Sequence, residues 1–152
     1  MKAITAQWYE GKVSYQKTME DGTEKKVNET YVVDALCFAE AENRLVEYVN
    51  SYVIIGEFSV SALKIAAYKE VFFSEIDEED KWYNKWYKAK VQLLTIDEKS
   101  GKEKRTSINY LVNGSSVESA RRNLEGMMGS SAMDYVIVGI NEMPIIDIFY
   151  QG

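Results

Sequence analysis

One sequence pattern occurs twice in this chain of 152 residues, and the repetition limits the possible folds more than any other feature. Residues 8–13 read WYEGKV and residues 86–91 read WYKAKV, and the segment 58–73 aligns with the segment 135–150. The sequence therefore predicts a tandem duplication. Between these blocks the same residue types recur in the same order, at Gly22 and Gly101, Glu24 and Glu103, Lys25 and Lys104, Tyr31 and Tyr110, Val33 and Val112, Ala41 and Ala120, and Leu45 and Leu124.

Each copy begins with the period-two alternation that is typical of a half-buried strand. Tyr9 and Val13 alternate with polar residues in the first copy, as Tyr87 and Val91 do in the second. The dipeptides at 21–22 (Asp-Gly) and 100–101 (Ser-Gly) predict hairpin turns, because glycine adopts the positive φ that such turns require. Second strands are expected at 24–33 and 103–112.

The apolar spacing then becomes helical in both copies. Asp34 is the predicted N-cap of the first helix, and Ser115 with Glu118 predicts a capping box on the second. Pro144 interrupts any strand ladder, so Ile145–Tyr150 is expected to form a separate strand at an edge or beyond a bend. The apolar stripes consist of Phe38, Ala41, Leu45, Tyr48, Val49 and Tyr52 in the first helix, and of Val117, Ala120, Leu124, Met127 and Met128 in the second.

These patterns predict an α+β fold, a tandem duplication of a ββαβ(β) unit with mostly antiparallel sheet and helices on one face. The expected organisation is a first repeat at residues 1–73, an acidic linker at 74–81 and a second repeat at 82–152. A unit of this size is marginal as a free-standing domain. The two repeats are therefore predicted to pack as one pseudo-two-fold globule, by a shared sheet or face to face.

Composition excludes several classes of protein. The chain has no His and a single Cys, which excludes an internal disulfide framework, a Cys-based zinc site and the usual general base of a Ser or Cys triad. Its net charge of −6 gives no overall attraction to nucleic acid or anionic lipid, although the second repeat alone is slightly basic. No segment approaches the ~20 apolar residues of a membrane span. We expect a cytoplasmic protein.

The segment 81–90 is the most unusual local feature, because most of its residues are Lys, Trp or Tyr. An exposed strand of this composition could stack unpaired bases and hold phosphates. The competing interpretation is that these residues serve packing and not binding, because Trp8 and Lys12 in the first copy match Trp86 and Lys90 in the second. The candidate binding residues are Trp8, Lys12, Trp82, Trp86, Lys88 and Lys90.

Other reactive side chains give weaker signals. Cys37 opens the first predicted helix but matches Ser116, so we interpret it as a small helix-terminal residue. The acidic residues at 74–80 lack the spacing of a calcium-binding loop, so we interpret them as a solvent-exposed acidic segment. Glu70 and Asp147 are the only repeated acids between apolar residues, and an outward-facing acid or one bonded to Lys12 or Lys90 is expected. We expect no catalytic residue, no metal site and no cofactor.

The WYxxKV start, the Gly-containing hairpins, the Tyr-Val-Val and Tyr-Leu-Val strands and the closing apolar run together resemble a known family. It is a domain-length family of unknown function found in Bacteroidetes, their phages and mobile elements. The resemblance covers nearly the whole chain, and it implies a small bacterial cytoplasmic or phage-borne protein. It carries over no catalytic residue.

The functional expectation is a small non-enzymatic binding or interaction module whose partner is a protein. The alternative is single-stranded nucleic-acid binding through the Lys and aromatic strand of the second repeat. A remote alternative is a hydrolase that uses carboxylates and a metal ion. The sequence excludes a membrane partner and leaves the oligomeric state open.

Overall fold

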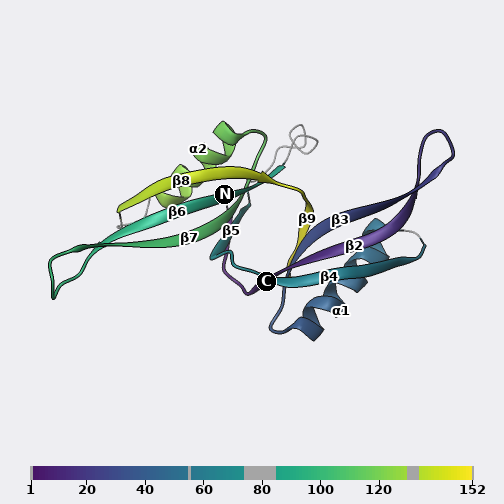
Figure 1. The fold of residues 1–152 in the computed structure, drawn as a ribbon, viewed down its shortest axis with the longest axis horizontal. Coiled ribbons are helices and arrows are strands. Elements are labelled where there is room, and N and C mark those ends of the chain that lie inside the picture. Colours follow the sequence, from purple (N-terminus) through teal and green to yellow (C-terminus); the bar gives the residue numbers. More distant parts are fainter. Residues whose placement is uncertain (1, 55, 74–84, 130–133, 152) are drawn as a thin grey trace. The chain divides into compact units, whose positions relative to one another are not determined.

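The segments with period-two alternation form strands, and those with helical spacing form helices. The computed structural model describes residues 2–54, 56–73, 85–129 and 134–151 (Figure 1). The predicted linker at 74–81 lies outside these residues. The strands are β1 (Lys2–Ile4), β2 (Trp8–Thr18), β3 (Glu24–Asp34), β4 (Phe58–Ala66), β5 (Glu70–Phe73), β6 (Lys85–Ile96), β7 (Glu103–Gly114), β8 (Asp134–Met143) and β9 (Ile145–Phe149); the helices are α1 (Phe38–Tyr48), the π-helix η1 (Val49–Val53) and α2 (Val117–Met128).

The chain divides into two compact units, and the first combines Met1–Thr5 with Tyr68–Met143. Its sheet has the strand order β1-β5-β7-β6-β8, in which only the β5–β7 pair is parallel. Helix α2 lies across one face of this sheet and contacts β5, β7 and β8 (Figure 1). Between helix and sheet lies a core whose fully buried centre includes Ala89, Val91, Val112 and Leu124.

The second unit combines Ala6–Ala67 with Pro144–Gly152. Its sheet has the order β4-β2-β3-β9, in which only the β3–β9 pair is parallel. Helix α1 contacts β2, β3 and β4. Val13, Leu45 and Val49 form the buried core, and Gly11 leaves the space that the Leu45 side chain fills.

The predicted α+β fold class is confirmed, because the described residues form two α-helices and two mostly antiparallel sheets. The predicted turns are confirmed as well, since Gly22 and Gly101 have φ angles of 84° and 67°. The segment after Pro144 forms the separate strand β9 at a sheet edge, as the proline predicts.

The compact units do not coincide with residues 1–73 and 82–152, because β1 and β5 lie in the sheet with β6, β7 and β8, and β9 lies in the sheet with β2, β3 and β4. Strand β5, from residues 1–73, pairs with β7, and β9, from residues 82–152, pairs with β3. The registers correspond, with Glu70 opposite Tyr110 and Asp147 opposite Tyr31. Each sheet is therefore completed by a short parallel strand that arrives from elsewhere in the chain.

The predicted helix caps are wrong by one to three residues. Cys37 and Ser116 are the N-caps, with φ and ψ of −156° and 169° for Cys37 and −155° and 169° for Ser116. Ser116 Oγ accepts a hydrogen bond from the Ser119 N–H at 3.1 Å. Asp34 ends β3 instead, where its carboxylate accepts the N–H of Gln151 at 3.2 Å and lies 3.5 Å from the Arg44 guanidinium.

The buried stripes are narrower than the sequence predicts. Ala41, Leu45 and Val49 are buried on α1 and η1, as are Ala120, Leu124 and Met128 on α2. The outer members of the stripes are exposed, with Phe38 at 49%, Tyr52 at 80% and Val117 at 52%. A helix that covers a small sheet buries only its central line of side chains, so the flanking positions remain in solvent.

Gly126→Ala is expected to stabilise the protein by about 0.5–1 kcal/mol. Gly126 is an exposed interior residue of α2, and a Cβ at this position would meet no atom within 4 Å. Urea unfolding followed by circular dichroism measures the change. Gly22→Ala, which forces a φ of 84° on an L side chain, is the control and should destabilise.

Candidate functional site

A cavity in the first unit lies between α2 and the strands β5, β6 and β7 of the sheet. Its volume is about 230 Å³. Strand β5 and the residue before it, strands β6 and β7, and the last turn of α2 all contribute to it. The lining residues are Lys69, Glu70, Phe72, Leu93, Tyr110, Met127 and Met128.

The walls of this cavity are apolar and partly adaptable. The Phe72 ring stacks on the Tyr110 ring, with centroids 4.9 Å apart. Opposite them, Met127 and Met128 contribute unbranched thioether side chains that change shape at little cost. The cavity can therefore enclose a small apolar group against two aromatic rings.

The polar groups of the cavity belong to Lys69, Glu70 and Tyr110. Burial raises the pKa of the Tyr110 hydroxyl, and the Glu70 carboxylate raises it further. The hydroxyl therefore remains protonated at neutral pH and is a hydrogen-bond donor, not a base. The Lys69 backbone N–H donates to the Asn109 carbonyl at 2.8 Å, which fixes the start of β5, while its side chain is exposed. The cavity thus offers the carboxylate of Glu70 and the hydroxyl of Tyr110 beside apolar walls.

The corresponding place in the second unit holds more aromatic rings. Phe149 stacks on Tyr31 at 5.3 Å and on Tyr48 at 4.7 Å, so three aromatic rings pack together. The hydroxyls of Tyr15 and Tyr31 both donate to the Glu29 carboxylate, the latter at 3.3 Å. The tyrosine rings and their carboxylate partner therefore make this cluster polar where the cavity of the first unit is lined by Leu93 and methionines.

Asp147 lies beside this cluster, opposite Tyr31 in the parallel ladder. Its side chain remains exposed, yet the surrounding atoms remove enough solvent from the carboxylate to raise its pKa. A hydrogen bond from the Ile148 N–H to Oδ1, at 2.8 Å, opposes this effect.

Glu29→Gln is expected to lower the pKa of Tyr15 from about 12 toward its ordinary value of 10.0, because the hydrogen bond to Glu29 is the largest cause of the shift. A folded-state pKa above the unfolded value contributes stability below pH 10 that is lost as the pH rises toward 12. NMR titration of ¹³C-labelled tyrosine measures the pKa directly. An unchanged Tyr15 titration in the variant would contradict the role of Glu29.

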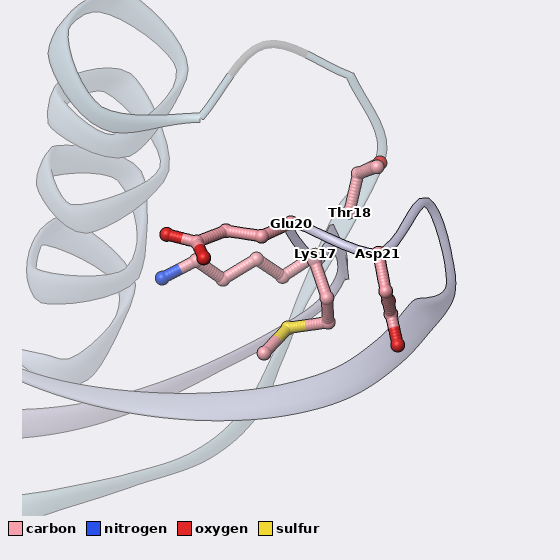
Figure 2. Close-up of a pocket in the computed structure, with 5 residues that line it drawn as sticks. Lys17, Thr18, Glu20 and Asp21 are labelled. Carbon is pink, nitrogen blue, oxygen red and sulfur yellow. The ribbon is translucent and has the colours of Figure 1, made fainter.

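A second hollow, of about 490 Å³, lies at the β2–β3 hairpin and is lined by Lys17, Thr18, Met19, Glu20 and Asp21. In Figure 2 the side chains of Lys17 and Glu20 extend to one side of the hairpin, and that of Asp21 points away from them. Asp21 Oδ1 accepts hydrogen bonds from the N–H and hydroxyl of Thr23, which lower its pKa. Asp21 therefore closes the turn, and the hollow is an open surface of a single hairpin.

The structure separates the binding residues that the sequence singled out. Trp8 and Lys12 lie on β2 in the second unit, whereas Trp86, Lys88 and Lys90 lie on β6 in the first. Trp82 falls outside the described residues. The rings of Trp8 and Trp86 are only 1% and 7% exposed, while Lys12 and Lys90 are exposed and Lys88 is half-buried. The Trp86 ring meets Phe73 edge-on at 5.2 Å, a packing contact.

The sequence left two alternatives for Glu70, an outward-facing side chain or a bond to Lys12 or Lys90, and the structure does not bring Glu70 to Lys90. Glu70 lines the cavity beneath α2, whereas Lys90 alternates with the core residues Ala89 and Val91 and so lies on the other face of the sheet. Cys37 is exposed and free at the start of α1. Within the described residues, no group of three or more His, Cys, Asp or Glu side chains is placed to hold a metal ion.

Met127 and Met128 were predicted to belong to the apolar stripe of the second helix, and their place in the cavity was not predicted. Their spacing is that of an ordinary amphipathic element, so the periodicity does not indicate a cavity. The repeated acid between apolar residues was the available clue, because an acid at a buried strand position needs a pocket or a partner.

Comparison with known proteins gives one family. Residues 7–151 match the family described as Domain of unknown function (DUF4494). No curated protein and no solved structure matches the chain. No helix in the described part of the chain has the length and apolar character needed to cross a membrane.

Proposed function

We propose that this chain, which belongs to the DUF4494 family, is a small non-enzymatic binding module that recognises a protein partner. The observation that carries the proposal is the cavity of about 230 Å³ beneath α2. Pockets for drug-sized ligands and cofactors usually measure roughly 300–1,000 Å³. A smaller cavity suits one inserted side chain.

The lining indicates the chemistry of that side chain. Phe72, Leu93 and the two methionines favour an aliphatic or aromatic group, and methionine-rich walls accommodate more than one shape. The Glu70 carboxylate and the Tyr110 hydroxyl, which also line the cavity, would bind polar backbone groups of the partner. An apolar anchor surrounded by hydrogen-bonding groups is the usual arrangement of an interaction hot spot.

N-acetyl amino-acid amides test this proposal, because they present single side chains on a peptide-like backbone. In methionine methyl NMR, N-acetyl-leucinamide and N-acetyl-phenylalaninamide should shift the Met127 and Met128 signals and leave that of Met19 unchanged. N-acetyl-glycinamide is the matched ligand without an anchor. Equal shifts with the glycine probe, or no shift with the apolar probes, would contradict the proposal.

Single-stranded nucleic acid is the second candidate partner, and the open face of β6 favours it. Lys88 and Lys90 lie on the face away from α2, and neither forms an ion pair with any described residue. Gly139, opposite Lys90 on β8, leaves open space beside them. Because the Trp86 ring is buried, this mode rests on phosphate contacts and not on stacking at that ring.

Titration of labelled single strands at low salt distinguishes this alternative. Lys90→Glu should weaken binding and reduce the salt dependence by a slope of about 1. Lys102→Glu, a change in the exposed β6–β7 turn of the same unit, is the control with equal charge. Affinity that is indifferent to salt would exclude phosphate contacts, since these release counterions.

We further propose that residues 1–73 and 82–152 arose by tandem duplication of a ββαβ(β) unit. Supporting features are the matching N-cap conformations at Cys37 and Ser116 and the matching registers of β5 and β9. An exposed, unpaired Cys37 supports the reducing cytoplasm as the compartment. The bacterial and phage association remains an expectation that rests on sequence resemblance alone.

A further inference from the structure

The two sheets bind the same short sequence pattern in the same register. Glu70-Val71-Phe72 pairs with Tyr110-Leu111-Val112, and Asp147-Ile148-Phe149 pairs with Tyr31-Val32-Val33. In both cases an acid lies opposite a tyrosine, an aliphatic residue lies opposite an aliphatic residue, and the phenylalanine stacks on that tyrosine. Each sheet therefore has an acceptor edge for a parallel strand of the type acid–aliphatic–Phe.

The acceptor edge of the second unit holds its strand through a defined set of contacts. Ile145 and Ile148 are buried, and Phe149 lies against both Tyr31 and Tyr48. Beyond the strand, the Gln151 N–H donates to the Asp34 carboxylate at 3.2 Å. These contacts depend on the sequence of residues 145–151 and not on the chain that precedes them.

The way in which the chain reaches β9 allows the same segment of another copy to take its place. Strand β8 ends at Met143 in the first unit, and Pro144 begins the only segment that the C-terminal half contributes to the second unit. An identical segment from another copy would make every contact that β9 makes. Exchange of an identical element between protomers is a low-cost route to dimers, because the folded contacts are conserved.

We propose that two copies of this chain associate by exchanging their C-terminal strands, so that residues 145–149 of one copy pair with β3 of the other. The interaction surface is the β3 edge with Tyr31, Val32 and Val33, and the partner is a second copy of the chain. The proposal is independent of the side-chain cavity beneath α2, which lies in the other unit.

The test uses the full-length protein labelled at Cys37, the sole cysteine, which is exposed and lies outside the acceptor edge. One preparation carries a donor dye and the other an acceptor dye. After the two are mixed at high concentration, energy transfer should develop, and light scattering should detect a species of twice 17.4 kDa. Absence of both signals at every concentration would overturn the proposal.

A synthetic peptide of residues 144–152 then identifies the surface involved. An excess of this peptide should abolish energy transfer, because it occupies the same edge by mass action. The same peptide with Ile148→Asp is the matched control and should have no effect, since it would bury a charge opposite Val32. A dimer that resists the natural peptide, or that yields equally to both peptides, would overturn the proposal by assigning the association to another surface.

Discussion

Leu124→Ala is expected to lower the free energy of unfolding by about 2–5 kcal/mol. Leu124 is fully buried in the core between α2 and the sheet of the first unit, where Phe72, Tyr110 and Val112 belong to the same cluster. Removing its branched end loses the transfer free energy of the deleted atoms and leaves a cavity that the surrounding side chains fill only in part. Because a stable domain commonly has only 5–15 kcal/mol in total, the variant should show a large fall in melting temperature.

Urea unfolding with circular dichroism measures this loss, provided that the denaturant dependence is compared as well. An unchanged m-value with a lower midpoint indicates lost stability, not a more compact unfolded state. Val117→Ala is the control on the same helix, because Val117 is 52% exposed, and it should change stability by no more than about 0.5 kcal/mol. Equal losses in the two variants would contradict the assignment of Leu124 to the core.

Local signals made the hairpins and helices predictable. Alternation in residues 8–15 and 86–93 gave the strand faces, and Gly22 and Gly101 gave the turns, because only glycine adopts their positive φ without strain. The helix starts were displaced, since Asp34 has the correct residue type for a cap but is held by Arg44 and Gln151 at the end of β3. The capping propensity of a residue type does not predict whether that residue binds a partner elsewhere in the fold instead.

Which sheet β5 and β9 join was not predictable from the sequence. The pattern around Glu70 and Asp147 defines two strand faces, but both acceptor edges present a tyrosine followed by two aliphatic residues, so this pattern alone does not assign either strand to its sheet. Which strand joins which sheet depends on the length and path of the connections, and alternation does not encode these. The sequence accordingly predicted units at 1–73 and 82–152, whereas three segments of the chain, at 1–5, 68–73 and 144–152, belong to the compact unit that is formed mainly by the other half.

The candidate site differed from expectation for a related reason. Trp8 and Trp86 were predicted as binding residues because tryptophan is rare in the chain. A large ring on a strand usually packs in the core, however, and both residues are buried here. The cavity instead forms beside Met127, Met128 and Phe72. A methionine in the apolar stripe of a helix does not by itself predict a cavity. A cavity is a property of packing between elements, so it becomes visible only in three dimensions.

Gly114→Ala is expected to destabilise the protein by about 1–3 kcal/mol, although it adds a single methyl group. Gly114 ends β7, and a Cβ there would lie 2.8 Å from the backbone nitrogen of Ala120 and 3.0 Å from its Cα. Backbone atoms of a helix cannot rotate aside as a flexible side chain can. The start of α2 would have to move away from the sheet, which would loosen the packing of Ala120 and Leu124 together.

Gly139→Ala is the matched control, because Gly139 is also a strand glycine but has no atom within 4 Å of the added Cβ. It should be neutral or slightly stabilising, since glycine weakens the interior of a strand. Thermal and urea unfolding of the two variants side by side measure the difference, and hydrogen exchange should show the loss in Gly114→Ala at the amides of α2. Equal stability of the two variants would contradict the close approach of α2 to the end of β7.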